Sequence, residues 1–264
     1  MSKKLNNPKA TTPNPTSSSS SKPSPPPPTR ICVFCSATTG RSPSHLAAAR
    51  ELAETLHAHH VTLIYGGGSN GMMGELAKTL VRLAGKDAVL GIIPEAIVGV
   101  ERASSGGTDA RNGASGGGWI HKLHKRGSKA RSSASLNNDG DGSEEGPVAS
   151  EATCGKILIV PDLAHRKKEM ARLIATGGPG SGFIALSGGF GTMDEMMEVV
   201  TLHQFGVHKR KVCFYNVEGY WDGVTAWIGR AIEAGFVRRG MGEVVGVEKS
   251  GEACLRWLAD GAGG

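Results

Sequence analysis

Short apolar runs rich in β-branched residues alternate with amphipathic helical patterns along most of the chain. Most runs are apolar at consecutive rather than alternate positions, which is typical of strands covered on both faces. The runs lie at 31–35, 61–65, 88–93, 157–160, 183–186, 212–217 and 244–247. Helical patterns begin at Ser42-Pro43 and then cover about 72–84, 163–175, 193–205, 223–234 and 251–259. This alternation predicts an α/β fold with a doubly wound, Rossmann-like, mostly parallel sheet and helices on both faces.

Two segments lack the apolar residues that a core requires. Residues 1–30 are rich in Ser and Pro, and the segment at about 103–150 is rich in Gly and Ser. We expect a disordered tail at 1–30 and a disordered insertion at about 103–150. The remaining residues suffice for one domain, which we place at 31–260.

The net charge of +6 is concentrated in the tail, since residues 1–30 hold five Lys or Arg and no acid. The other 234 residues are nearly neutral, which argues against a protein that tracks a phosphate backbone with a basic folded surface, so we expect no nucleic-acid partner. No apolar run reaches the ~18 residues of a membrane-spanning helix, and the N-terminus lacks the apolar stretch of a secretory signal. The five scattered cysteines do not form a disulfide framework. These features predict a cytoplasmic protein without a membrane partner.

Two glycine-rich loops directly follow predicted strands, where an open α/β sheet binds its ligands. The first contains G-x-G-x-x-G as Gly66, Gly68 and Gly71. Glycine lets backbone N–H groups approach a phosphate, and a helix N-terminus adds positive potential. A tight strand-to-helix turn without a ligand is the alternative for this loop.

The second glycine-rich loop runs from Ser187 to Glu195. Two such loops in one domain suggest a nucleotide held from two strands. Neither has the Gly-Lys-Ser/Thr of a P-loop, which argues against triphosphate hydrolysis. Thr192 and Glu195 also have the spacing of a helix-capping box, so Glu195 has a structural alternative to a catalytic role.

A cationic cluster follows Asp162, the expected N-cap of a helix. The next turn and a half contains His165, Arg166, Lys167 and Lys168, although the helix dipole disfavours positive charge there. Arg166 and Lys167 are therefore candidates for contact with an anionic group of a ligand at the carboxyl edge of the sheet, and solvated surface charge is the alternative. The histidines and cysteines do not combine at zinc spacing, so we expect no metal site.

Several motifs appear in an order that resembles the Lonely Guy family of cytokinin-activating phosphoribohydrolases, formerly named lysine decarboxylases. They are Val33-Phe34-Cys35, the glycine loop Tyr65–Gly74, Gly91–Pro94, Asp162-x-x-x-Arg166-Lys167 and Gly188-Gly-x-Gly-Thr192-x-x-Glu195. The resemblance runs from about Ile31 to Leu258. Ser187 stands where the family usually has a proline.

The resemblance implies hydrolysis of the N-glycosidic bond of an N6-substituted adenosine 5′-monophosphate, without a cofactor. It implies Arg166 and Glu195 as the catalytic pair and a homodimer with its site near the subunit boundary. The implied phosphate-binding residues are Gly188, Gly189, Gly191 and Thr192. The rest of the implied substrate site consists of Gly67, Gly68, Glu101, Lys167, Phe190, Met193 and Thr201.

Other functions fit the same loops. A broader nucleotide 5′-monophosphate nucleosidase would use the same catalytic pair, and a non-catalytic nucleotide or cofactor carrier would need only the glycine loops. Retention of both Arg166 and Glu195 favours an enzyme over a carrier. The second glycine loop weakens the case for an NAD(P) oxidoreductase.

Overall fold

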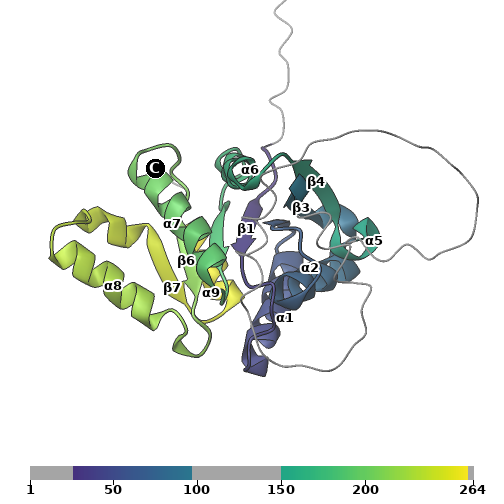
Figure 1. The fold of residues 1–264 in the computed structure, drawn as a ribbon, viewed down its shortest axis with the longest axis horizontal. Helices are drawn as coiled ribbons and strands as arrows, with labels where there is room; N and C mark the ends of the chain where they lie inside the picture. The colour runs from purple at the N-terminus through teal and green to yellow at the C-terminus, as the bar shows by residue number, and fades with distance from the viewer. Residues whose placement is uncertain (1–25, 97–149, 261–264) are drawn as a thin grey trace, which may run out of the picture.

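A computed structural model describes residues 26–96 and 150–260 of the chain (Figure 1). Most of the expected tail and insertion, and the candidate residue Glu101, lie outside these ranges. The described residues contain a seven-stranded sheet of order β4-β3-β2-β1-β5-β6-β7, in which every pair of neighbours is parallel. The predicted parallel α/β fold is confirmed. The strands are β1 (Arg30–Phe34), β2 (Thr62–Tyr65), β3 (Val89–Pro94), β4 (Lys156–Val160), β5 (Gly182–Ala185), β6 (Val212–Tyr215) and β7 (Val245–Glu248).

Helices cover both faces of this sheet. The helices are α1 (Pro43–Ala58), α2 (Gly71–Ala84), α5 (Glu151–Cys154), α6 (Leu163–Ala175), α7 (Phe190–Gln204), α8 (Asp222–Glu233) and α9 (Gly251–Ala259). Three short 3-10 turns lie at Lys86–Ala88, Val217–Gly219 and Arg239–Glu243. Figure 1 shows α1 and α2 on one side of the strands and α6 and α7 on the other. The doubly wound topology places the loops after β1, β2 and β5 side by side at the carboxyl edge of the sheet.

Alternate residues of each central strand build two separate cores. In β1, Ile31 and Val33 pack with α1, α2 and α9, while Cys32 and Phe34 pack with α6 and α7. Cys35 joins the first core, so Cys32 and Cys35 lie on opposite sides of the sheet. A strand that is buried on both faces needs apolar residues at consecutive positions, which is the pattern that predicted it.

Two predicted helix starts are confirmed. Ser42 caps α1 by accepting from the Ser44 N–H, and Pro43 occupies the first helical turn. Asp162 caps α6, with its Oδ1 accepting from the His165 N–H at 2.8 Å. Each cap satisfies one of the free N–H donors in the first turn of its helix.

The start of α7 differs from the capping-box spacing. The N-cap is Gly189, and Phe190 is the first helical residue. Thr192 and Glu195 therefore both lie inside the helix, where Glu195 cannot fold back onto the first turn. The capping interpretation of Glu195 is wrong, because the backbone already turns into the helix at the two glycines.

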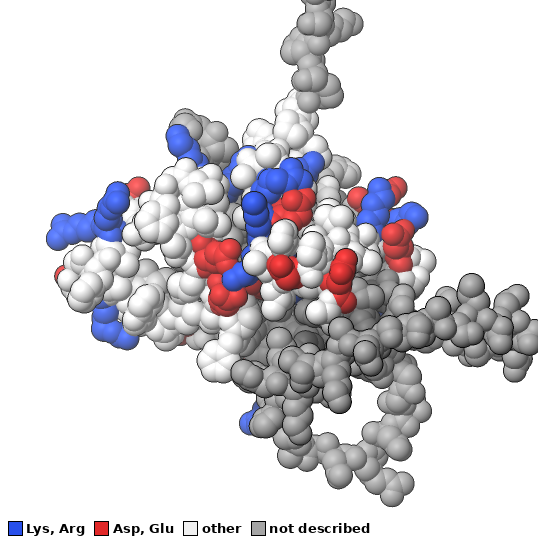
Figure 2. Space-filling model, turned by 45° about the horizontal axis from the view of Figure 1, so that its top comes forward, with Lys and Arg blue, Asp and Glu red and all other residues white. Residues whose placement is uncertain are grey.

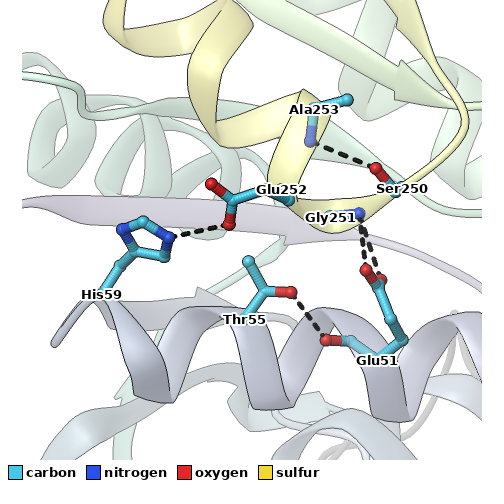
Figure 3. A network of polar contacts seen from close by, with 7 residues as sticks. All are labelled: Glu51, Thr55, His59, Ser250, Gly251, Glu252 and Ala253. Atoms are coloured by element: carbon cyan, nitrogen blue, oxygen red, sulfur yellow. Dashed lines mark hydrogen bonds and ion pairs between the residues drawn. The ribbon is translucent and has the colours of Figure 1, made fainter.

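A polar network between the second half of α1 and the start of α9 joins these helices (Figure 3). Both carboxylate oxygens of Glu51 accept from the Gly251 N–H at 3.1 Å, which satisfies a free donor at the start of α9. Glu51 Oε2 also accepts from the Tyr215 hydroxyl at 3.0 Å. An exposed pair between His59 and Glu252 adds little, because surface ion pairs are weak.

We expect Glu51→Ala to lower the free energy of unfolding by about 1–3 kcal/mol, because two partly buried donors lose their acceptor. Urea unfolding of the variant against the wild type measures this loss. Glu51→Gln, which retains an acceptor oxygen, is the matched control and should lose less. An unfolding midpoint equal to that of the wild type in Glu51→Ala would show that water replaces the carboxylate at no cost.

Candidate active site

The described carboxyl edge of the sheet brings two predicted residues together from different helices. Arg166 lies in the first turn of α6, and Glu195 lies on α7. The Arg166 Nη2 atom is 3.3 Å from Glu195 Oε1, and each side chain is only 13% exposed. The Arg166 Nε is buried and has no hydrogen-bond partner in the described part of the chain. The Arg166 Nε–H is thus a buried hydrogen-bond donor that no described residue uses.

The first glycine loop makes room for this arginine. A Cβ atom at Gly66 would lie 2.0 Å from Arg166 Nη2. Gly67 adopts a φ of +78°, and a Cβ there would lie 2.2 Å from the side chain of Ile93. The loop after β2 therefore contacts the guanidinium at Gly66, and the contact is possible because Gly66 has no side chain.

The N-terminus of α2 is not open to a phosphate. The N–H of Met72 donates to the Thr38 carbonyl at 3.3 Å, and the N–H of Met73 donates to the Ser36 carbonyl at 3.2 Å. These acceptors come from the loop after β1. The expectation that both glycine loops cradle phosphate does not hold for the first loop. Gly67 and Gly68 are buried, and Gly67 lies against Ile93 of β3.

The N-terminus of α7 has free donors. No group in 26–96 or 150–260 accepts from the N–H of Phe190, Gly191 or Thr192, and the first helical bond of α7 runs from Met193 to Gly189. Three unpaired N–H groups at the positive end of a helix dipole have the chemistry to accept an anion. A Cβ at Gly188 would lie 2.0 Å from Thr192 Oγ1, so this glycine allows the threonine to fold against the loop. Phe190 is 96% exposed beside these donors.

Burial perturbs the candidate carboxylate. The pKa of Glu195 is raised, chiefly because burial disfavours the charged form, although nearby Arg166 opposes this effect. The same surroundings raise the pKa of the Cys35 thiol, again mainly through burial. A carboxyl group with a perturbed pKa in an ion pair at a ligand-binding edge is a candidate for catalysis.

Lys167 interacts with acidic side chains of α7. Its Nζ lies 2.9 Å from Asp194 Oδ2 and also contacts Glu198 Oε2. The contact with Glu198 is the largest cause of the raised pKa of Lys167. The ammonium thus fastens α6 to α7 one residue away from Arg166.

One further candidate lies apart from the pair. Thr201 is exposed near the end of α7, and its hydroxyl donates to the Met197 carbonyl at 2.7 Å. It is six residues beyond Glu195, or about 9 Å along the helix. The described chain therefore does not bring Thr201 into the site that Arg166 and Glu195 form.

The structure also adds a residue that sequence patterns do not reveal. The Tyr220 hydroxyl, from the loop after β6, donates to the Gly188 carbonyl. Nothing in the spacing of Tyr220 marks it, because the two residues are 32 positions apart and meet only through the strand order.

Charged side chains on the face that carries α6 and α7 are interspersed. Figure 2 shows small groups of acidic and basic residues there and no continuous basic surface among the described residues. Within the same described ranges, no three His, Cys, Asp or Glu side chains are arranged to hold a metal ion. None of the helices in these ranges is long and apolar enough to span a bilayer.

Comparison with known proteins places the chain in a family. A family model described as "Possible lysine decarboxylase" matches residues 73–258, well over half of the chain. A cytokinin riboside 5′-monophosphate phosphoribohydrolase of Arabidopsis thaliana, LOG7, is 32% identical over 79% of this chain and 70% of its own length. The chain belongs to the Lonely Guy family. The resemblance read from the motifs is thus confirmed at the level of the family.

Two further comparisons extend this result. A bifunctional cytokinin biosynthesis protein of Fusarium pseudograminearum is 34% identical over 86% of this chain, which spans only 39% of that relative's length. The molybdenum cofactor carrier protein of Chlamydomonas reinhardtii is similar in structure, with a TM-score of 0.50 and 15% identity, covering 88% of this chain and 97% of its own. At that identity the likeness establishes the fold alone.

Proposed function

We propose that this Lonely Guy family member hydrolyses the N-glycosidic bond of N6-substituted adenosine 5′-monophosphates, releasing the free base and ribose 5-phosphate. The observation that carries the proposal is the largely buried pair of Arg166 and Glu195 beside the free N–H groups of α7. The N–H groups suit the phosphate of a nucleotide, and the Arg166–Glu195 pair suits the glycosidic bond that is broken. The names of the curated relatives agree with this reaction.

The residues divide the chemistry between them. The N–H groups of Phe190, Gly191 and Thr192 bind the 5′-phosphate and fix the position of the ribose. Cleavage of the bond at C1′ builds positive charge on the ribose, and the Glu195 carboxylate stabilises that charge. Arg166 orients the carboxylate through the contact at 3.3 Å and offers its free Nε–H to the substrate. The reaction uses no cofactor in this scheme.

The exposed ring of Phe190 is suited to the base. It is apolar, lies next to the phosphate donors and has nearly all of its surface free. An aromatic ring in this place can stack on a purine or contact an apolar N6 substituent. Met193, one turn further along α7, adds a second partly buried apolar side chain.

We further propose a homodimer. Thr201 lies too far from Arg166 and Glu195 to serve their site within one chain, and Phe205 and Val207 leave a large apolar area exposed just beyond it. An interface over this end of α7 would cover that area and bring Thr201 near a neighbouring site.

The five cysteines are all free, which agrees with a reducing, cytoplasmic location.

Incubation of the purified protein with three compounds tests the reaction. We expect free base from N6-isopentenyladenosine 5′-monophosphate, less from AMP and none from N6-isopentenyladenosine, because only the first two carry the phosphate that α7 binds. Chromatographic separation of the products measures this. Equal turnover of AMP would indicate a broader nucleosidase, and a folded protein that binds nucleotide but releases no base would indicate a carrier.

A further inference from the structure

Three loops at the carboxyl edge are joined by side-chain contacts that the proposed reaction does not use directly. The loop after β5 contains Ser187 and Gly188. The Ser187 Oγ lies 3.0 Å from the His45 Nδ1 of α1, and the Gly188 carbonyl accepts from the Tyr220 hydroxyl of the loop after β6. His45 and Tyr220 also contact each other edge to face, with ring centroids 5.8 Å apart.

A second set of bonds fixes the positions of these two side chains. Glu218, two residues before Tyr220, has a φ of +51° and accepts from the Ser42 hydroxyl at 3.1 Å. A non-glycine residue in this left-handed region is strained unless its surroundings hold it. The bond ties the Tyr220 loop to the start of α1, three residues before His45. The segments that carry the two rings are therefore connected by this hydrogen bond as well as by the contact between the rings.

The Tyr220 contact has a direct geometric consequence for the anion site. The Gly188 carbonyl and the Gly189 N–H belong to one planar trans peptide, in which they point in opposite directions. A hydroxyl that holds the carbonyl on one side therefore directs the Gly189 N–H to the other side, and no group in 26–96 or 150–260 accepts from that N–H. Two consecutive glycines would otherwise sample many orientations of this peptide.

We propose that Tyr220 and His45 are positioning residues that order the Ser187–Gly189 segment for binding of the substrate phosphate. Ser187 takes part through its hydroxyl, which a proline at this position would lack. Ordering the donors before the ligand arrives lowers the entropy lost on binding. This inference rests on the proposed function, since it assigns the phosphate to the N-terminus of α7.

Calorimetric titration of the full chain with ribose 5-phosphate tests the proposal. In Tyr220→Phe we expect the Kd to rise about three- to tenfold, as for loss of one hydrogen bond. The KM for the nucleotide should rise with it, while kcat changes little. Tyr215→Phe is the matched control. It removes the hydroxyl of Tyr215, the last residue of β6, which donates to Glu51 and not to Gly188. It should lower the Tm and leave the Kd unchanged.

A second pair of variants tests His45. His45→Leu should raise the Kd, and His45→Asn, whose amide can reach the position of Nδ1, should restore part of the affinity. An unchanged Kd in folded Tyr220→Phe or His45→Leu overturns the proposal, as does a wild type that does not bind ribose 5-phosphate. Binding requires no turnover, so a wild type that binds this compound but releases no base would overturn the proposed reaction and leave the positioning role intact.

Discussion

Glu195→Gln is expected to lower kcat on a nucleoside 5′-monophosphate by about 10²–10³-fold, because it removes the charge that stabilises the cationic ribose. The amide has the shape of the carboxylate and still accepts from Arg166. Binding of the phosphate at the start of α7 does not involve this group, so KM should change little. Steady-state kinetics of the two proteins measures both effects.

The same variant should keep its Tm or raise it. Burial raises the pKa of Glu195 in the folded chain despite the opposing effect of Arg166. A carboxyl group that binds its proton more tightly when folded has an ionised form that lowers stability above both pKa values. The neutral amide removes this cost at pH 7. A purely structural Glu195 would give the reverse result, with lower Tm and normal kcat.

The raised pKa also predicts the pH profile of the wild type. Activity that needs the Glu195 carboxylate falls as pH drops through its pKa, so the acid limb of kcat/KM should lie above the range of an ordinary glutamate. The residual activity of Glu195→Gln should lack this limb. A limb at the usual carboxyl pKa, retained in the variant, would mean that another group is titrating.

Local sequence patterns predicted the strands and several helix starts. Each predicted strand is confirmed. The central strands are buried on both faces, which leaves a run of consecutive apolar residues such as Phe183–Leu186, whereas β4 and β7 at the sheet edges have exposed positions. Helix starts with a polar cap were also predictable, as Ser42 and Asp162 show. The start of α7 was not, because glycine at the N-cap makes no side-chain bond that a pattern could identify.

The contacts across the site depend on strand order instead. Arg166 follows β4 at the edge of the sheet, yet its guanidinium lies against Gly66 after β2 and Glu195 after β5. The charge pattern predicted that Arg166 and Lys167 meet an anionic group of a ligand, and it did not reveal that both also contact carboxylates of α7. For Lys167 the partners include Asp194 and Glu198 of the same chain. The choice of these partners depends on how α6 lies against α7, which no local sequence pattern specifies.

Gly66→Ala is expected to reduce kcat/KM by about 10²-fold without unfolding the protein. The new Cβ would lie 2.0 Å from Arg166 Nη2 and 3.2 Å from its Cζ, so the guanidinium must move by on the order of 1 Å. Gly66 has no positive φ, so its backbone accepts alanine. The strain therefore falls on the far end of a flexible side chain, and the Tm should change little. Kinetics and thermal unfolding together measure this.

The matched control is Gly223→Ala on α8, where a Cβ has nothing within 4 Å among the described residues. It makes the same chemical change away from the site and should retain full activity.

Arg166→Lys separates the position of the side chain from its charge. If placement of the guanidinium matters, kcat/KM should fall as much as in Gly66→Ala, since lysine keeps the charge but lacks the forked donors. Full activity in Gly66→Ala would mean that catalysis tolerates a displaced Arg166, and that Glu195 acts without being oriented by the guanidinium.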